Sequence, residues 1–474
     1  MTHILVLGAG PVGLTTAMLF AAEGHRVTVL DRDHSSTREP SVLTGGEWKR
    51  SGVTQFAHTH ILMPAGFNVL EAELPGVVDR LLSLGGRRHN MIGGAWGLGN
   101  VGERREEDVK FETVTARRPV MEMALFAEAR ATPGVTIRCG TRVTGLLTGG
   151  ARTLGRPHVT GVTTQNGEAF EADLVVDTLG RNTVMPSLLT GLGAAPAERR
   201  ANSGFRYYTR YFRAGSGEMP AQLPWPLLFH TGVTLITGPG DNDTWSVTVS
   251  TSGRDQQLRE LRNNDVWERV MALYPTASHW AKGEPLTDVQ VLGGIESRVR
   301  DYLYDGLPVA TGVIAVGDAW ATTNPQYGMG MTAGFQQAVQ LRDVVRTVGV
   351  SNAVDLGRYY NEVRAEAQMP LWESTHAWDT HRLAEIDAEL AGERYVTDDP
   401  DWNVRNVLHA VRNQDPEILR AYAEVACMVS TVEDAFVKTG LIERVLTLGG
   451  GDLPRYDEPG PSRAELLDAI GAGV

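Results

Sequence analysis

The chain opens with two short apolar runs separated by a segment with helical spacing. Residues 3–7 and 26–30 are apolar enough to be buried strands. Between them, residues 11–23 place apolar side chains on one side of a helix, which ends at Gly24. A strand, a helix and a second strand within about 30 residues predict a parallel sheet, because the helix returns the chain to the same end.

The middle of the chain has the pattern of strands. Residues 135–147, 158–164 and 168–176 are each predicted to form one strand, with Asn166–Gly167 as a hairpin turn between the last two. From about residue 204 to residue 250, aromatic and polar residues alternate. This alternation predicts an antiparallel sheet with one buried face.

The last third of the chain changes from strand to helix. Residues 311–316 are predicted to form a buried strand, and a long helix is expected from near Gly328 to about residue 348. Beyond residue 351 the pattern is almost entirely helical. No stretch has the composition of a linker, so the domains are expected to be interleaved.

Composition narrows the class of protein. The 474 residues include 44 Lys and Arg against 57 Asp and Glu, a formal net charge of −13. This acidic balance argues against a non-specific nucleic-acid binder, and no nucleic-acid partner is expected. The two cysteines, Cys139 and Cys427, lie far apart and form neither a zinc spacing nor a disulfide framework. A cytoplasmic location is therefore expected.

Residues 4–22 carry no charged side chain and are nominally long enough to cross a bilayer. Three glycines and Pro11 lie at the centre of this stretch, and no Lys or Arg precedes it. A buried strand, turn and helix explain the stretch better than a membrane span or a signal peptide.

The turn after the first strand reads Gly8-Ala9-Gly10-Pro11-Val12-Gly13. In a dinucleotide fingerprint, the first glycine allows a tight turn, the second lets the backbone approach a pyrophosphate, and the third lets helix and strand pack closely. Asp31 follows the second strand, 23 positions after Gly8, where it would accept hydrogen bonds from ribose hydroxyls. The alternative is a structural glycine-rich turn of an unrelated α/β domain.

Residues 97–102 fit the same glycine pattern. A charged run, residues 103–108, stands where an apolar helix would have to begin, and no strand ending in an acidic residue follows. This segment is therefore predicted to be a loop. A second dinucleotide-binding fold, dedicated to nicotinamide, is not expected.

A third motif joins the strand at 311–316 to the long helix. The strand ends at Gly317-Asp318, and Gly328, Met329, Gly330 and Met331 open the helix. Asp318 is placed to bind a chain of hydroxyl groups, and the helix N-terminus could stabilise a negatively charged ring edge. The alternative is a strand-end aspartate that caps a helix.

Two further clusters of residues are expected to have mainly structural roles. His58 and His60 alternate as neighbours in a strand would, and without a third ligand nearby we expect a packed or hydrogen-bonded pair and no metal site; the alternative is a contact with the flavin or the substrate. Arg206, Arg210 and Arg213 alternate with tyrosines. We expect a sheet edge with a solvated face there, and some of the aromatic residues could line a substrate pocket.

Together these motifs resemble FAD-dependent monooxygenases of the aromatic-hydroxylase type. The resemblance spans roughly residues 1–350 and includes Arg50-Ser51-Gly52-Val53, the segment 117–122 that begins Arg-Arg-Pro, and Val176-Asp177-Thr178-Leu179-Gly180-Arg181. The segment 55–60 and the C-terminal region look closer to actinobacterial FAD-dependent oxidoreductases, including polyether epoxidases, than to phenol hydroxylases.

The resemblance implies which residues contact FAD. The ADP half would lie against the glycine turn and Asp31, the phosphates or ribityl chain against two arginines, and the flavin ring against the start of the long helix. The expected cofactor residues are Gly8, Gly10, Pro11, Val12, Gly13, Asp31, Arg32, Arg50, Arg118, Gly317, Asp318, Gly328, Met329, Gly330 and Met331. Because Thr178 and Leu179 separate Asp177 from Gly180, a role of that motif in nicotinamide binding stays open.

The implied fold class is α/β. A Rossmann-like FAD-binding domain would comprise residues 1–84, 110–200 and 290–350. An interleaved antiparallel substrate domain would comprise residues 85–109 and 201–289, followed by a helical C-terminal region at 351–474.

The implied reaction inserts one oxygen atom from O2 into an apolar or aromatic small molecule, through a flavin C4a-hydroperoxide, as a hydroxylation or an epoxidation. Electrons would come from NAD(P)H or from a partner flavin reductase. The mechanism requires no catalytic side chain, and none is assigned. The alternatives are a flavin-dependent reductase or dehydrogenase, a halogenase, for which the Trp-x-Trp-x-Ile-Pro segment is missing, and a non-catalytic FAD-binding protein.

Overall fold

The computed structural model describes residues 2–34, 50, 53, 55–56, 58–215, 217–450, 456, 458 and 460–471. A five-stranded parallel sheet, in the order β20-β9-β1-β2-β5, is assembled from separate parts of the chain. Its strands are β1 (His3–Leu7), β2 (Arg26–Leu30), β5 (Val135–Arg138), β9 (Leu174–Asp177) and β20 (Val313–Ala315). Helix α1 (Pro11–Ala22) joins β1 to β2, which confirms the predicted strand–helix–strand unit.

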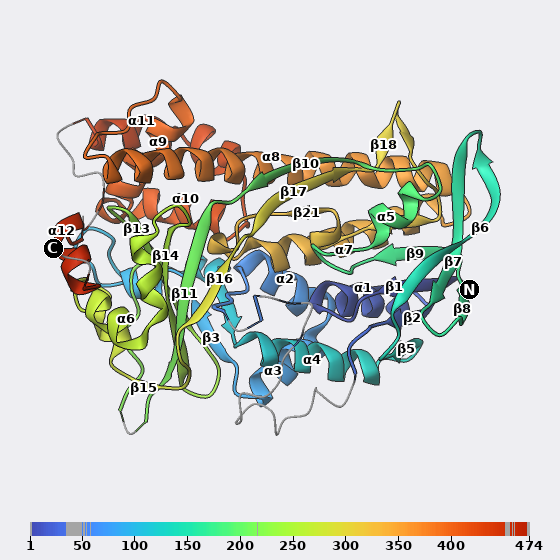
Figure 1. Cartoon of the computed structure of the whole chain (residues 1–474), viewed down its shortest axis with the longest axis horizontal. Helices are drawn as coiled ribbons and strands as arrows, with labels where there is room; N and C mark the ends of the chain where they lie inside the picture. Colours follow the sequence, from blue (N-terminus) through green and yellow to red (C-terminus); the bar gives the residue numbers. More distant parts are fainter. Residues whose placement is uncertain are drawn as a thin grey trace.

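The two faces of this sheet are covered differently (Figure 1). Helices pack on one face and share one apolar core with it: α1, α2 (Pro64–Glu73), α3 (Pro75–Ser83), α4 (Arg118–Ala131) and α7 (Met329–Val348). The other face packs against a three-stranded antiparallel sheet of β6 (Val143–Thr153), β7 (Arg156–Thr164) and β8 (Ala169–Glu171) and against α5 (Met185–Thr190).

Two of the predicted strands are wrong in extent. Residues 135–147 are divided between β5 in the parallel sheet and β6 in the antiparallel one, with Gly140 at φ +69° in the break. Residues 168–176 are likewise divided between β8 and β9. The hairpin turn is confirmed, because β7 pairs with β8 and Gly167 has φ +78°. Each break redirects the chain from one sheet to the other.

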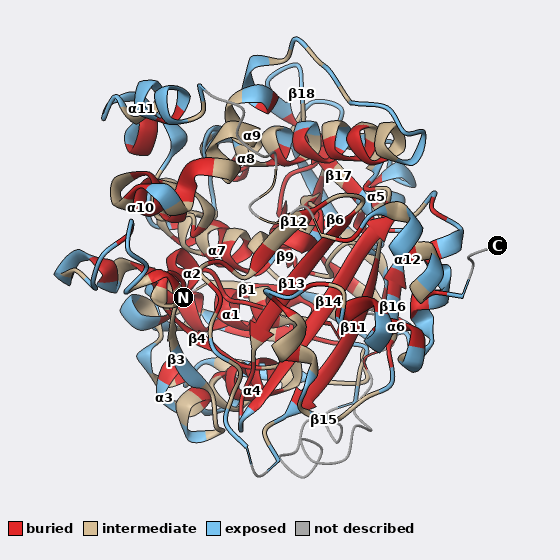
Figure 2. Ribbon diagram, turned by 90° about the vertical axis from the view of Figure 1, so that its left-hand side faces the viewer, coloured by how far each residue is buried: buried red, intermediate tan, exposed pale blue. Residues whose placement is uncertain are grey.

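A second large sheet lies beside the first and confirms the predicted antiparallel region. Its order is β12-β13-β14-β11-β15, and β16 also pairs with β11. The strands are β11 (Phe205–Arg213), β12 (Leu227–His230), β13 (Val233–Pro239), β14 (Thr244–Ser252), β15 (Glu284–Pro285) and β16 (Gln290–Gly293). Helices α6 (Asn264–Met271) and α12 (Arg463–Ala469) cover one face, and the central strands are buried (Figure 2).

The prediction of a solvated sheet edge at Arg206–Arg213 is wrong. β11 lies inside the sheet, between β14 on one side and β15 and β16 on the other. Arg210 is buried and forms an ion pair with Glu268, whereas Arg213 at the strand end is exposed and pairs with Glu284. The arginines therefore serve ion pairs at the sheet, and the tyrosines between them are buried.

Shorter ladders and the C-terminal helices complete the architecture. β10 (Ala197–Asn202), β17 (Glu296–Asp301) and β21 (Ala321–Thr322) form one sheet, β3 (Arg87–Asn90) pairs with β4 (Glu112–Thr115), and β18 (Leu303–Tyr304) pairs with β19 (Leu307–Pro308). The helices α8 (Ala353–Leu390), α9 (Pro400–Val411), α10 (Pro416–Ala426) and α11 (Leu441–Leu448) follow. The α/β class with antiparallel sheets and a helical C-terminal region is confirmed, while the residue bounds of the domains stay a prediction.

Two segments singled out in the sequence have simple structures. Residues 97–102 form turns with no helix, which confirms a loop. Residues 4–22 form the buried strand β1 and helix α1. Across the described ranges, no helix is both long enough and apolar enough to cross a membrane.

Candidate cofactor and substrate site

A cavity of about 380 Å³ begins at the carboxyl ends of β1 and β2 and continues to the inner face of the antiparallel sheet. In parallel α/β sheets this end of the strands is where ligands bind. All of the predicted cofactor residues except Gly13 and Gly317 line the cavity. The fold therefore brings motifs more than 300 residues apart in the chain to one space.

The three glycines of the first turn have different surroundings. Gly8 has φ +104°, and a Cβ there would lie 2.7 Å from the Thr178 carbonyl oxygen. A Cβ on Gly13 would lie 2.0 Å from the Gly8 carbonyl oxygen, so this glycine allows α1 to pack against the turn. A Cβ on Gly10 would meet no atom of the described residues within 4 Å, apart from its two neighbours in the chain. Gly8 and Gly13 are thus required by the fold, whereas Gly10 leaves space open in the cavity.

Asp31 lies at the end of β2 and is only 3% exposed. Its Oδ2 accepts hydrogen bonds from the Ala9 N–H at 2.6 Å and from Arg50 Nη2 at 2.9 Å, and its Oδ1 accepts one from the Asp33 N–H at 2.8 Å. The carboxylate therefore holds the glycine turn in place.

Arg50 is held by three carboxylates. It contacts Asp31 at 2.9 Å, Asp33 at 2.7 Å and Glu122 at 2.5 Å. These attractions outweigh the effect of burial and raise the pKa of Arg50. Ser51 and Gly52, which follow it in the quoted motif, lie outside the described residues.

Glu122 connects Arg50 to Arg118, the first residue of α4, whose Nε donates to it at 2.7 Å. Burial would raise the pKa of Glu122, but the two guanidinium groups lower it to about 2. Sequence reasoning missed Glu122, although its spacing of four from Arg118 on a helix is a local signal. Arg117 turns away from the cavity and pairs with Asp241 at 2.7 Å.

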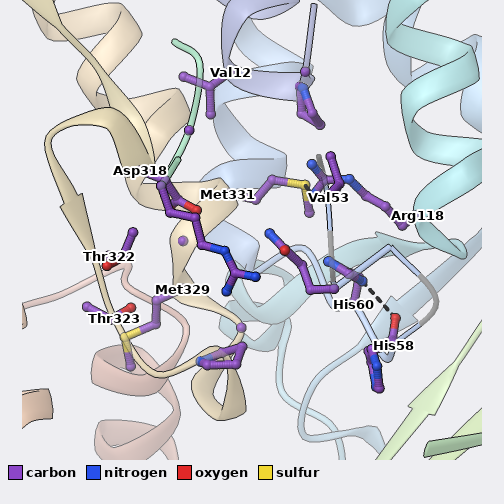
Figure 3. Close-up of a pocket in the computed structure, with 18 of the residues that line it drawn as sticks. Val12, Val53, His58, His60, Arg118, Asp318, Thr322, Thr323, Met329 and Met331 are labelled. Atoms are coloured by element: carbon purple, nitrogen blue, oxygen red, sulfur yellow. Dashed lines mark hydrogen bonds between the residues drawn. The ribbon is translucent and has the colours of Figure 1, made fainter. Parts of the chain in front are cut away.

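Asp318 and the start of α7 form the opposite wall (Figure 3). Gly317 has φ +66° and opens the one-turn 3-10 helix η7 (Gly317–Ala319), leaving Asp318 half-buried at the cavity. Burial raises the pKa of Asp318, and Arg118, Arg181 and Arg300 oppose this. Among the described residues, no donor is hydrogen-bonded to its carboxylate.

The capping alternative for Asp318 is wrong. The residue that caps α7 is Gly328, at φ +67°, and Val316 precedes η7. Asp318 thus caps the N-terminus of neither helix. Met329, Gly330 and Met331 line the cavity beside it, and Arg118 Nη1 lies 3.4 Å from Met331 Sδ.

The far end of the cavity is apolar and aromatic. The antiparallel sheet contributes Tyr207, Thr209, Leu227, Ile236, Thr248 and Leu292. Trp225 and Tyr422 form a corner with their ring centroids 5.0 Å apart and their planes at 73°. Tyr422 comes from α10, so the C-terminal helices also build the cavity, which the sequence did not show.

His58 and His60 are the predicted hydrogen-bonded pair. His60 Nδ1 donates to the His58 carbonyl oxygen at 2.7 Å, and His58 Nδ1 lies 2.8 Å from Thr209 Oγ1 (Figure 3). Burial lowers the pKa of His58 to about 4 and that of His60 to about 3, so both are neutral at pH 7. Ala57 between them lies outside the described residues. In the described ranges, no three His, Cys, Asp or Glu side chains are grouped to hold a metal ion.

Residues 1–369 match the family described as FAD binding domain. The chain belongs to this FAD-binding family. It is 27% identical over 396 residues to Protein Rv3254 of Mycobacterium tuberculosis, covering 78% of each chain. It is 26% identical over 360 residues to 6-methylpretetramide 4-monooxygenase of Streptomyces rimosus, covering 73% of this chain and 75% of the relative.

Solved structures share the fold. PqsL, a probable FAD-dependent monooxygenase from Pseudomonas aeruginosa, has a TM-score of 0.58 at 18% identity, covering 81% of this chain and 99% of PqsL. CmlS, a flavin-dependent halogenase, has a TM-score of 0.58 at 16% identity, covering 99% of this chain and 76% of CmlS. The protein is an FAD-dependent oxidoreductase.

The residues of the cavity fit FAD. Gly10 leaves open the space that a pyrophosphate needs, at the N-terminus of α1. Asp318 presents a carboxylate that no described donor uses, as a ribityl chain requires. The middle motif also reaches the cavity through Thr178, Leu179, Gly180 and Arg181, while the Asp177 carboxylate is buried and accepts hydrogen bonds from the Leu179 N–H and Thr183 Oγ1.

Replacing Asp318 tests its place in the cofactor site. Asp318→Ala is expected to weaken FAD binding by about 10- to 150-fold, because hydrogen bonds to a charged group contribute about 1.5–3 kcal/mol. The fold should survive, since no described side chain or N–H depends on this carboxylate. A flavin titration beside a thermal melt measures both quantities. Asp401→Ala, at an exposed position of α9, is the matched control and should change neither. Unchanged FAD affinity in folded Asp318→Ala would contradict the assignment.

Proposed function

We propose that this protein inserts one oxygen atom of O2 into an apolar or aromatic small molecule, by hydroxylation or epoxidation. The observation that carries the proposal is the continuity of the cavity. The end that fits FAD and the end lined by Tyr207, Trp225 and Tyr422 belong to one space, so a substrate can lie against the cofactor. The monooxygenase among the relatives, which is aligned over 73% of this chain, supports the same reaction class.

Bound FAD supplies the redox and oxygen chemistry. The protein's own residues bind and orient the cofactor and the substrate, and they exclude water. The glycine turn and Asp31 would hold the ADP half, Arg118 and Asp318 the central part, and Met329 to Met331 the ring. The sheet and the Trp225–Tyr422 corner would hold the substrate and keep solvent from the reacting atoms. His58 and His60 are neutral and hydrogen-bonded within the wall, so they add polarity without charge.

The electron source is proposed to be NAD(P)H or a separate flavin reductase. The protein is proposed to act in the cytoplasm. Mixing oxidised enzyme with NADPH in the absence of oxygen separates the two sources. Bleaching of the flavin supports direct reduction by NADPH. Unchanged absorbance, together with turnover when a flavin reductase is added, supports a two-component system.

The reaction is tested with isotopically labelled O2 and a panel of apolar aromatic compounds. One labelled oxygen atom is expected in the product, and none when only the water is labelled. Turnover that proceeds equally under nitrogen, with no labelled oxygen in the product, would overturn the proposal in favour of a reductase or dehydrogenase. A chlorinated or brominated product in the presence of halide would instead indicate halogenation.

A further inference from the structure

A buried carboxylate lies behind the substrate half of the cavity. Asp379 is on α8, ten residues beyond the end of the family match, and is 2% exposed. Its Oδ1 accepts hydrogen bonds from Asn324 Nδ2 at 2.9 Å and from the Tyr327 hydroxyl at 3.2 Å. Among the residues that the structure describes, its Oδ2 has no hydrogen-bond partner. Nothing in the proposed reaction so far uses this group.

No described Lys or Arg forms an ion pair with Asp379. The titratable groups that face it are Tyr207 from β11 and Tyr327 from the short helix η8 (Pro325–Tyr327). On α8 itself, Arg382 is committed to Glu385 and to the His230 carbonyl oxygen. Arg405 from α9 acts on Tyr327. Burial raises the pKa of Asp379 to about 7, against the two hydrogen bonds that favour its charge. The carboxyl group therefore gains and loses a proton near neutral pH.

Two rings connect Asp379 to the cavity. Tyr207 and Tyr327 both line it, and Tyr327 is the more exposed of the two. The orientation of Asn324 is fixed, because its Oδ1 accepts from the Tyr207 hydroxyl and from the Gln326 N–H at 3.0 Å. Its Nδ2 must therefore donate to Asp379, whatever the protonation state of that carboxyl group. The Tyr327 oxygen accepts a long hydrogen bond from Gln326 Nε2 at 3.4 Å, which leaves the hydroxyl hydrogen and one lone pair, so the hydroxyl can still donate or accept.

We propose that Asp379 is a positioning residue that sets whether Tyr327 offers the substrate a hydrogen-bond acceptor or a donor. This rests on the proposed function, in which this half of the cavity holds the substrate. When Asp379 is ionised, the Tyr327 hydroxyl must donate to it, and the lone pair of the phenol oxygen that Gln326 does not use is left to accept from a substrate hydroxyl. The substrate class this selects is an apolar ring that carries an oxygen substituent.

Protonation of Asp379 reverses the arrangement. The added proton is best placed on Oδ1, where the Tyr327 oxygen accepts it, because Oδ2 faces no acceptor. Tyr327 then turns its own hydroxyl hydrogen towards the cavity, where a carbonyl oxygen of the substrate can accept it. The site thus favours a carbonyl group below neutral pH and a hydroxyl group above it.

The test is equilibrium binding to oxidised, FAD-loaded enzyme without any reductant. Phenol and acetophenone are the probes, because both carry one ring but only phenol can donate, and neither ionises between about pH 6 and about pH 8.5. The affinity for acetophenone relative to phenol is expected to fall about three- to tenfold across this range, as expected for one hydrogen bond. Toluene, which makes no hydrogen bond, should show no change.

Two variants separate this role from a merely structural one. Asp379→Asn has nearly the same shape and cannot ionise, and Tyr327→Phe keeps the carboxyl group but removes the hydroxyl; both should give a ratio independent of pH. Asp401→Asn on α9 should keep the wild-type profile. Asp177, whose pKa burial raises to about 6, is present in every variant, so its contribution cancels in the comparison.

A ratio that does not change with pH in the wild-type enzyme would overturn the inference. So would an equal change in Tyr327→Phe, or the failure of both probes to bind. These outcomes are independent of the oxygen-insertion test, because no reductant is present and the enzyme does not turn over. A pH-dependent ratio with no labelled oxygen in any product would contradict the proposed reaction alone. A ratio independent of pH with labelled oxygen in the product would contradict the role of Asp379 alone.

Discussion

Gly10→Val is expected to give a folded protein that retains no FAD. A Cβ at this position would meet no atom within 4 Å among the described residues beyond its chain neighbours, and φ is −78°, so neither packing there nor backbone strain opposes the substitution. The branched side chain would instead occupy the space at the N-terminus of α1 that the pyrophosphate needs. The purified variant should show no flavin absorbance and a circular dichroism spectrum like that of the wild-type enzyme.

The chain provides a matched control for this experiment. Gly99 occupies the corresponding position of the second glycine pattern, has open space around it, and lies outside the cavity. Gly99→Val should retain FAD in full. Gly13→Val should fail differently, by loss of folded protein, because its Cβ would lie 2.0 Å from the Gly8 carbonyl oxygen. Full FAD occupancy in Gly10→Val would show that the glycine turn does not hold the cofactor.

Arg50→Ala is expected to cost about 3–5 kcal/mol of unfolding free energy, because it removes a cation shared by buried carboxylates and leaves Glu122 with Arg118 alone. Glu122 is fully buried and Asp31 is 3% exposed, and both contact the Arg50 guanidinium. Loss of this contact should also weaken FAD binding, since Asp31 holds the Ala9 N–H within the glycine turn. Urea unfolding and a flavin titration measure the two effects.

The comparison variant is Arg346→Ala. Arg346 is exposed and pairs with Glu23 at 2.6 Å, and such a surface pair contributes little to stability because solvent screens it. If Arg50→Ala lost no more unfolding free energy than Arg346→Ala, the stabilising role of the buried ion pairs of Arg50 would be contradicted.

Acid should weaken the same cluster. The pKa of Glu122 in the folded protein is about 2, below its ordinary value, so its contribution to stability is full above about pH 4.5 and is lost as the pH falls towards 2. The difference in unfolding free energy between wild-type enzyme and Glu122→Gln should therefore shrink between about pH 5 and about pH 2. A difference that stays constant over this range would contradict the assigned ion pairs.

Local patterns determined the first part of the fold. Both ends of β1 and of β2 agree with the predicted strands, because each run is apolar, short and bounded by a turn signal. The strands at 135–147 and 168–176 were predicted too long, because the residues on either side of each break are equally compatible with a strand. Which sheet each piece joins depends on partners elsewhere: β5 pairs with β2, and β9 pairs with β1 and β20.

The sequence by itself determined the cofactor motifs. A glycine turn between strand and helix, and an aspartate at a strand end, depend only on residues a few positions away in the chain. Only the tertiary structure decided what surrounds them. Glu122 is 72 residues from Arg50, Tyr207 is 117 from Asn324, and Tyr422 comes from a helix beyond the family match. In the sequence, a buried Asp379 or Glu122 cannot be told from a solvated carboxylate on a helix. Burial raises the pKa of Asp379, whereas the Arg50 and Arg118 guanidinium groups lower that of Glu122. Both surroundings arise only when distant segments pack together.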